Sequence, residues 1–175
     1  MKKYTIAFFD TKSYDEESFN KVNEEFNFEI KYFKGHLNKN NIILTKDVDA
    51  VCIFVNDMAD TEIIDAMAQN GVKLLALRCA GFNNVDIAAT QGKMTVVRVP
   101  AYSPYAVAEH AVALMLALNR KTHRAYLRTR DGNFSLHGLL GFDTYGKTAG
   151  IIGTGKIAKK LIMILRGFGM NILAY

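Results

Sequence analysis

The amino-acid sequence predicts an α/β protein in which a layered parallel sheet is followed by the beginning of a second parallel sheet. Strand-like and helix-like segments alternate over residues 1–100, and this alternation is typical of parallel strands joined by helices. A long, mainly apolar helical segment follows Pro100. A buried strand, a glycine turn and a helix then occupy residues 149–167, the order that opens a further β-α-β unit.

Five strand-like segments lie in the first hundred residues. Ala50–Val55 is a continuous apolar run, which is typical of a strand buried on both faces of a sheet. The expected strands are residues 4–9, 28–33, 50–55, 72–77 and 94–99. Parallel strands with intervening helices predict a flavodoxin-like layered sheet.

Start and stop signals place the helices between these strands. Ser13 to Glu16 has the pattern of a capping box, which predicts an amphipathic helix extending to about Phe26. Asp60 or Thr61 is expected to cap a second helix that ends at Asn70-Gly71. A short third helix is expected over residues 84–91, closed by Gly92.

The pattern changes at Pro100, so we expect one lobe over residues 1–100 and a second over residues 101–175. Ser103 is a good N-cap and Pro104 a good first residue for a helix that runs to about Arg128. Between Val107 and Leu118 the segment is apolar on nearly every face. A helix of this kind is expected to be buried all round, between domains or between subunits.

Composition argues against several classes of protein. Of the 175 residues, 50% are hydrophobic and 22% are charged, so disorder is not expected. The sequence shows no leader pattern and no apolar run long enough to span a bilayer, and we expect a cytoplasmic protein without a membrane partner. Cys52 and Cys79 fit no metal-ligand spacing, so no metal site is expected.

The net charge of +5 has two interpretations. Several basic residues gather near the end of the long helix, and they could contact nucleic acid. They could instead form the solvated C-terminal end of a helix, where cations suit the helix dipole. We favour the second interpretation, and expect no nucleic-acid partner, because no aromatic interleaving or nucleic-acid motif accompanies these charges. The residues are Arg120, Lys121, Arg124, Arg128 and Arg130.

Two glycine motifs lie close together, and their context separates them. Gly141 to Thr148 matches the P-loop pattern letter for letter. A P-loop requires a strand before it and a helix after it. Here a polar loop precedes the motif and a strand follows it, so we reject a nucleoside triphosphate site.

The second motif, Gly153 to Ala158, has the correct flanks. Gly153 permits a tight turn, Gly155 lets a diphosphate approach the backbone, and Ala158 takes the small-residue position where helix packs on strand. The helix that begins at Lys156 would point its positive end at the phosphates. We therefore predict a dinucleotide site here; the alternative is an ordinary strand-to-helix turn.

Three ordered motifs carry a resemblance to a known family. They are Arg78–Asp86, Val99–His110, and Gly146-Lys147-Thr148 leading into the glycine turn. Together they resemble the D-isomer-specific 2-hydroxyacid dehydrogenases. The Tyr-Ser-Pro and Ala-Glu-His sequences are most similar to those of the D-lactate dehydrogenase branch. The resemblance covers the whole chain. It implies a substrate lobe followed by a Rossmann NAD-binding domain, NAD-dependent interconversion of D-lactate and pyruvate, and a homodimer, which we expect to form through the helix 103–128.

The resemblance also implies site residues. The loop Cys79-Ala80-Gly81 would hold the substrate carboxylate through backbone amides, since a small turn presents N–H groups to an anion without obstruction. Tyr102 falls on the substrate-pocket tyrosine of the family. Without the resemblance, these residues would be a strand-to-helix connection and a packed aromatic. The cofactor set would be Val107, Gly153, Thr154, Gly155, Lys156 and Ile157.

No catalytic residue is assigned. Hydride transfer to a carbonyl needs an acid/base of near-neutral pKa, but none of the four histidines occupies the family's catalytic motif. His110, in the apolar helix, is expected to be a structural histidine with its hydrogen bonds satisfied. In the family the catalytic histidine, its acidic partner and the substrate-orienting arginine lie beyond the position of Tyr175. We therefore expect the chain to stop within the first β-α-β of the NAD-binding domain and to be inactive alone.

Two alternatives belong to other classes. One is a non-catalytic module that binds a dinucleotide or another protein. The other is an incomplete gene product without activity of its own.

Overall fold

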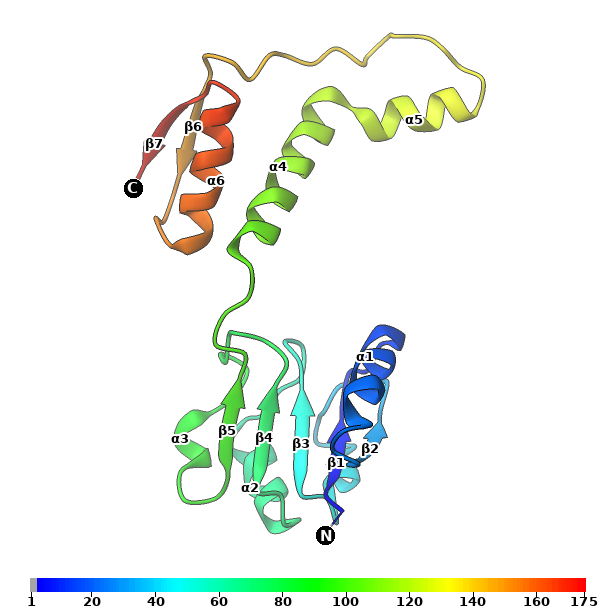
Figure 1. The fold of residues 1–175 in the computed structure, drawn as a ribbon, viewed down its shortest axis with the longest axis vertical. Helices are drawn as coiled ribbons and strands as arrows, with labels where there is room; N and C mark the ends of the chain where they lie inside the picture. The colour runs from blue at the N-terminus through cyan, green and yellow to red at the C-terminus, as the bar shows by residue number, and fades with distance from the viewer. Residues whose placement is uncertain (1–2) are drawn as a thin grey trace. The chain divides into compact units, whose positions relative to one another are not determined.

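The computed structural model describes residues 3–175, which divide into two compact units (Figure 1). The first unit ends at Tyr102 and the second begins at Ser103. Each unit has its own sheet and its own helices, and each is described separately below.

The first unit is built on one sheet of five parallel strands (Figure 1). The strand order is β2-β1-β3-β4-β5, the flavodoxin-like order that the alternation of segments predicts. All four residues of β3 are buried, as expected for a central strand covered on both faces. The strands are β1 (Thr5–Phe8), β2 (Glu29–Tyr32), β3 (Ala50–Ile53), β4 (Leu74–Leu77) and β5 (Thr95–Arg98).

Helices cover the two faces of this sheet. On one face, Phe19 of α1 (Ser13–Asn23) meets Phe8 of β1, with 4.7 Å between ring centroids. On the other face, α2 (Thr61–Gln69) packs on alternate residues of β3 and β4. The remaining helices are a short 3-10 turn, η1 (Ile42–Thr45), and α3 (Ile87–Thr90).

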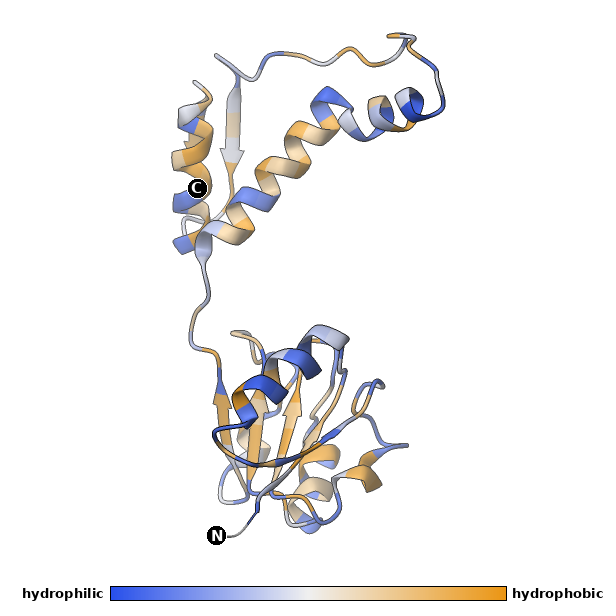
Figure 2. Cartoon of the chain, turned by 45° about the vertical axis from the view of Figure 1, so that its right-hand side comes forward, coloured by the Kyte–Doolittle hydropathy of each residue, from blue (hydrophilic) through white to orange (hydrophobic). Residues whose placement is uncertain are grey.

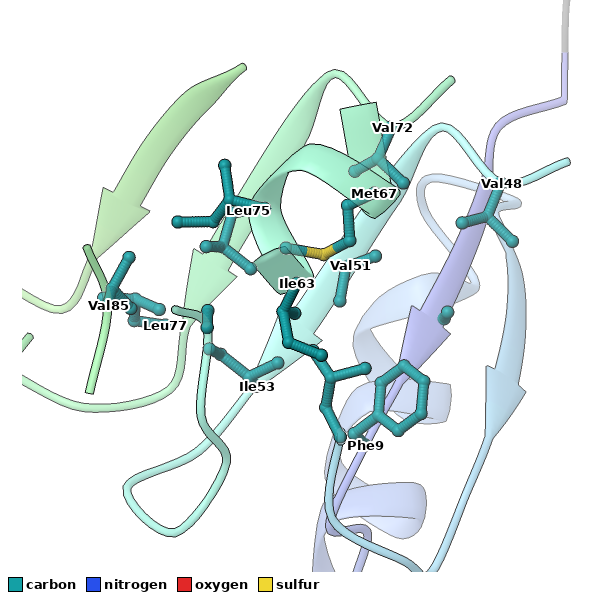
Figure 3. Close-up of a cluster of buried hydrophobic side chains, with 14 of the residues drawn as sticks. Phe9, Val48, Val51, Ile53, Ile63, Met67, Val72, Leu75, Leu77 and Val85 are labelled. Atoms are coloured by element: carbon teal, nitrogen blue, oxygen red, sulfur yellow. The ribbon is translucent and has the colours of Figure 1, made fainter. Parts of the chain in front are cut away.

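The core of the first unit lies between α2 and the sheet. Figure 3 shows Ile63 and Met67 of α2 among Val51, Ile53 and Leu75 of the central strands. Each of these five side chains is almost completely buried. This dry, close-packed layer fixes α2 on the sheet and so fixes the strand ends that carry the loops.

Local capping differs from the sequence prediction at two helices. Ser13 is not the N-cap of α1; that position belongs to Lys12, whose backbone N–H donates to Asp15 Oδ2 at 3.0 Å. The helix also ends at Asn23 rather than near Phe26. The third helix begins at Ile87, not at residue 84, because Val85 is held in a parallel bridge with Ala59 and Asp86 is the cap.

The second unit contains a two-stranded parallel sheet and three helices. Strands β6 (Thr148–Ile151) and β7 (Asn171–Ala174) are joined by the crossover helix α6 (Lys156–Gly167). This β-α-β unit was predicted from the glycine turn. Helix α4 (Pro104–Arg120) packs on α6, and Ala108, Val112 and Leu165 are the buried residues of this pair.

The long helix predicted to reach Arg128 is two helices. Lys121 has a positive φ of 51°, which breaks the chain into α4 and α5 (Thr122–Arg130). A left-handed residue cannot continue a right-handed helix, and neither neighbouring side chain signals the break in the sequence.

Within its own unit, helix α4 is covered on one side only, and its expected burial between domains or subunits stays a prediction. Only the stripe that meets α6 is covered, because α6 is the one helix of this unit that packs against it closely. Leu118 is 69% exposed, and His110 is also exposed within this unit. Figure 2 shows the hydrophobic colouring that continues along α4 and α6. Over residues 3–175 no helix is both long and apolar enough to cross a lipid bilayer.

The core of the first unit makes a stability prediction. Leu75→Ala removes a side chain with no exposed surface and leaves a cavity under α2, so unfolding should become easier by about 2–5 kcal/mol. Urea unfolding followed through the amide NMR signals of β3 and β4 measures this. The control is Ile43→Ala, because Ile43 is 63% exposed and its loss should cost no more than about 0.5 kcal/mol. Equal effects from both changes would contradict the assigned core.

Candidate functional site

The first candidate site is the loop that follows β4. Since the five strands are parallel, their carboxyl ends meet at one edge of the sheet, where ligands bind in open α/β folds. The loop Cys79-Ala80-Gly81 emerges at this edge, directly after Arg78. No atom outside the loop lies within 4 Å of the position that a Cβ on Gly81 would occupy, so the chain leaves open space around this residue.

Three successive carbonyl groups of this loop accept hydrogen bonds from the protein itself. Cys79 O accepts from the backbone N–H of Val99 at 3.2 Å. Ala80 O accepts from Arg98 Nη1 at 2.7 Å, and Gly81 O accepts from the Cys79 thiol at 3.2 Å. The carbonyls are therefore turned toward the body of the unit.

The corresponding amide N–H groups point the other way. A trans peptide is planar, with its C=O and N–H on opposite sides, and the structure contains no cis peptide among residues 3–175. The N–H groups of Ala80, Gly81 and Phe82 share peptide planes with the three bonded carbonyls. Within the described chain none of the three donates to a protein acceptor. A row of free amides of this kind can bind an anion.

Arg78 anchors the start of this loop. Its side chain is 9% exposed, and its guanidinium donates to Phe9 O at 2.9 Å and to Asp10 O at 3.0 Å. The same group lies 4.2 Å from the centroid of the Phe8 ring and 3.7 Å from a carboxylate oxygen of Asp15. These contacts offset the cost of burying the charge and tie the end of β4 to the end of β1.

A second polar cluster lies at the same edge of the sheet, after β1 and β3. The carboxylate of Asp57 is buried and accepts from the backbone N–H groups of Leu37 at 2.7 Å and Phe54 at 2.6 Å. Burial raises the pKa of Asp57, and these two N–H bonds oppose the rise. Asp10, also buried, pairs with Lys12 Nζ at 2.6 Å. Both oxygens of Asp57 are used to hold loops, so its role here is structural.

Tyr102 lies on the segment after β5 and is 59% exposed. In the part of the chain that the structure describes, it makes no hydrogen bond or ring contact. Val107, in the first turns of α4, is 41% exposed. Both residues thus present apolar surface to solvent within their own units, and their roles remain predictions.

The second candidate site is the glycine turn between β6 and α6. Gly153 has a φ of +88°, a conformation that favours glycine, and Gly155 is the N-cap of α6. Gly153 N–H donates to Tyr175 O at 2.8 Å, which fixes the turn to the end of β7. The following N–H groups, from Thr154 to Ala158, have no acceptor among the described residues.

The space in front of this turn is open. It is a groove of about 590 Å³, lined by residues 150–153, 155–158 and Leu161. A Cβ placed on Gly155 would meet no atom within 4 Å, and no side chain caps the helix. The free N–H groups and the helix dipole make this groove suited to a phosphate group. The turn brings together Gly153, Thr154, Gly155, Lys156 and Ile157, as the sequence predicts.

The P-loop-like segment is not a phosphate site. It runs from a loop into β6, in the order expected from the sequence. The backbone of Phe142 is bonded on both sides by the Asn119 side chain, from Nδ2 to Phe142 O at 2.7 Å and from Phe142 N to Oδ1 at 2.9 Å. Its backbone is therefore used to hold the loop on α4.

No acid/base stands out beside either site. Each of the four histidines is exposed, and only His36 approaches a carboxylate, with Nδ1 at 3.6 Å from Asp10 Oδ1. Among residues 3–175 no three His, Cys, Asp or Glu side chains converge in a way that could hold a metal ion.

The comparisons with known proteins agree with this arrangement. Residues 6–168 match the family model of the D-isomer specific 2-hydroxyacid dehydrogenase, catalytic domain. The chain belongs to the D-isomer-specific 2-hydroxyacid dehydrogenase family.

Relatives within this family are similar over nearly the whole chain. A 2-hydroxyacid dehydrogenase homolog of Haemophilus influenzae is 54% identical over 171 residues, covering 97% of this chain and 52% of the relative. The D-lactate dehydrogenase of Escherichia coli is 53% identical over 171 residues, with the same coverage. The chain therefore spans about half the length of the curated relatives it matches.

Solved structures of the family have the same fold. The apo-structure of Escherichia coli D-lactate dehydrogenase matches with a TM-score of 0.88 and covers 97% of this chain and 54% of that one. The D-lactate dehydrogenase of Aquifex aeolicus, solved with NAD and lactic acid, matches with a TM-score of 0.78 at 28% identity, covering 97% and 50%.

The sequence did not identify the side chains that hold the loop Cys79-Ala80-Gly81. Arg78 lies in the family motif Arg78–Asp86 but had no predicted role, and Arg98 lies in a predicted strand. One signal was available for Arg78: a charged residue directly after a buried parallel strand lies at the edge where loops meet. No comparable signal identified Arg98, because its partner is 18 residues away in the chain.

The buried thiols make a chemical prediction. Burial raises the pKa of Cys52 from 9.0 to about 11 and also raises the pKa of Cys79. At pH 8 the Cys52 thiolate fraction should be about 100-fold below that of an unperturbed thiol. Only the thiolate reacts with an alkylating reagent, so labelling of Cys52 should be slow. Iodoacetamide labelling followed by mass spectrometry should show Cys52 protected in the folded chain and labelled in urea. Rapid labelling of Cys52 while the native amide spectrum persists would contradict the packing.

Proposed function

We propose that this chain forms the substrate-binding unit and the opening of the NAD-binding unit of a D-2-hydroxyacid dehydrogenase that interconverts D-lactate and pyruvate. The observation that carries the proposal is the row of free amides at Ala80, Gly81 and Phe82, on a loop whose carbonyls are all bonded inward. The Escherichia coli relative, a D-lactate dehydrogenase, supports the substrate.

The loop Cys79-Ala80-Gly81 binds the carboxylate of a small 2-keto or 2-hydroxy acid. Free N–H groups supply directed donors, and the open space at Gly81 lets the anion approach the backbone. The Cys79 thiol is a donor to Gly81 O rather than a nucleophile, since it is buried and protonated. Tyr102 lines the substrate pocket.

The cofactor is NAD, which supplies hydride exchange with the carbon bearing the substrate oxygen when it is bound. The free N–H groups from Thr154 to Ala158 hold its diphosphate, and the Gly155 position leaves room for this contact. Val107 packs near the nicotinamide. The Aquifex aeolicus relative, solved with NAD and lactic acid, supports this choice of cofactor.

The assembly is a homodimer through residues 103–128. Leu114 and Leu118 of α4 and Tyr126 of α5 are all more than half exposed within the chain. Covering such side chains contributes about 1.5–3 kcal/mol each.

The proposed compartment is the cytoplasm. Both cysteines are free thiols, which suits a reducing environment. The proposal includes no nucleic-acid or membrane partner.

One observation favours the second candidate, a non-catalytic module that binds dinucleotide or protein. Among the described residues, none of the four histidines forms a side-chain hydrogen bond or ion pair with either loop, so no histidine is placed to transfer the substrate proton. Activity measurements and cofactor binding separate the two candidates.

Cofactor binding can be tested at Gly155. Gly155→Val adds a side chain whose Cβ meets no protein atom within 4 Å and which fills the space assigned to the diphosphate, so NADH should bind at least about tenfold more weakly without loss of stability. NMR titration of the Thr154 to Ala158 amides with NADH measures this. The control is Gly167→Ala, at the far end of α6, where a Cβ also meets no neighbour; NADH binding should be unchanged. Equal NADH affinity in wild type and Gly155→Val would contradict the assigned site.

Turnover gives a second test. Incubated with D-lactate and NAD, the purified 175-residue polypeptide should produce no NADH above the buffer blank, because the described residues place no proton acceptor at the loop. Absorbance at the NADH band measures the product. Sustained, enzyme-dependent NADH formation that pyruvate inhibits would show that an acid/base has been overlooked.

A further inference from the structure

Arg98 is the last residue of the edge strand β5, and its side chain reaches the loop Cys79-Ala80-Gly81. Its Nη1 donates to Ala80 O at 2.7 Å, and its guanidinium carbon lies 5.5 Å from the centroid of the Phe82 ring. We propose that Arg98 is a positioning residue that orients the Ala80–Gly81 peptide so that the Gly81 N–H faces the substrate carboxylate. This inference rests on the proposed function of the loop.

The loop needs this hydrogen bond because steric contacts do not fix the orientation of the Ala80–Gly81 peptide. Gly81 has no side chain, and a Cβ there would meet nothing within 4 Å. Glycine tolerates both signs of φ, so rotation of the Ala80–Gly81 peptide meets no steric barrier from side chains. If this peptide turned over, the carbonyl would face the site and would repel a carboxylate. The hydrogen bond from Arg98 selects the orientation that presents the N–H.

The register of the sheet places Arg98 where it can do this. Arg98 pairs with Leu77, the last residue of β4, and the next residue, Val99, donates its N–H to Cys79 O. Arg98, the last residue of β5, and Val99, the residue that follows it, thus hold two successive carbonyls of the loop. The chain direction after β4 is fixed separately by Arg78, so Arg98 acts on the tip of the loop and Arg78 on its start.

An arginine is suited to this task. The hydrogen bond from its guanidinium to a carbonyl is charge-assisted and therefore stronger than a neutral one. The planar group can also lie near the Phe82 ring while it donates. A lysine would keep the positive charge but has no planar group with which to hold both neighbours.

Arg98 can be changed without endangering the fold. Its side chain is exposed, and the core of the unit does not include it. Arg78, by contrast, is nearly buried and bonded to two carbonyls of the β1 loop, so its loss would disturb the unit as a whole. The test therefore uses Arg98→Met, which removes charge and donors, and Arg98→Lys, which keeps the charge.

The experiment is an NMR titration of the isotope-labelled 175-residue chain with sodium pyruvate. In the wild type, the Ala80, Gly81 and Phe82 amides should shift and saturate. Arg98→Met should weaken pyruvate binding by about tenfold, the equivalent of one charge-assisted hydrogen bond. Arg98→Lys should weaken it nearly as much, because the orienting geometry is lost. The matched control is Lys93→Met, which removes another exposed cation paired with Asp65 and should leave pyruvate binding unchanged.

Ligand-free spectra give a readout that a merely stabilising residue would not change. In Arg98→Met, the Ala80 carbonyl carbon and the Gly81 amide should shift while the signals of β3 and the urea midpoint stay at wild-type values. Unchanged Ala80 and Gly81 signals would overturn the proposal.

The outcomes with pyruvate separate the possible failures. Wild-type affinity in Arg98→Met would overturn the positioning role, and wild-type affinity in Arg98→Lys would overturn the requirement for the planar guanidinium. If pyruvate shifts no loop amide in the wild type, the proposed function of the loop fails, while the ligand-free spectra still decide whether Arg98 orients the peptide.

Discussion

Parallel pairing of the strands is the constraint on which the rest of the structure depends. Five strands that run the same way deliver all their carboxyl ends to one edge, and each must then leave through a loop at that edge. Buried charges join these loops: Arg78 connects the ends of β4 and β1, and Asp57 holds the loop after β3 to the segment at Leu37. These hydrogen bonds connect the loops at this edge to one another without any ligand.

Both candidate sites present backbone groups rather than side chains. In each, some backbone groups are hydrogen-bonded within the protein while neighbouring N–H groups are left without an acceptor among the described residues. In the β4 loop, carbonyl groups are bonded to the protein and amide groups are left outside. In the glycine turn, Gly153 N–H is bonded to the sheet and the next amides stay free. A Cβ at Gly81 or Gly155 would meet no protein atom within 4 Å, so the proposed recognition of ligands by the backbone accounts for the small residues at these places.

The sequence predicts the layout well and the local breaks poorly. Periodicity and the run Ala50–Val55 identify every strand and the flavodoxin-like order, because burial on both faces leaves a strong apolar pattern. The break at Lys121 and the true cap at Lys12 were missed, since both are set by backbone conformation without a characteristic residue type. The apolar composition of α4 did not show which of its faces α6 covers, and that was evident only from the packing. Motifs singled out both candidate loops, but the roles of Arg78 and Arg98 at the loop after β4 were evident only in three dimensions.

The hydrogen bond between Gly153 N–H and Tyr175 O has a consequence for the shape of the glycine turn. The turn is closed by the residue that follows the next strand, beyond the whole of α6. Its shape therefore depends on the pairing of β6 with β7 as well as on its own glycines. A change that displaced the backbone at Tyr175 would disturb the turn, although Tyr175 lies outside the glycine motif.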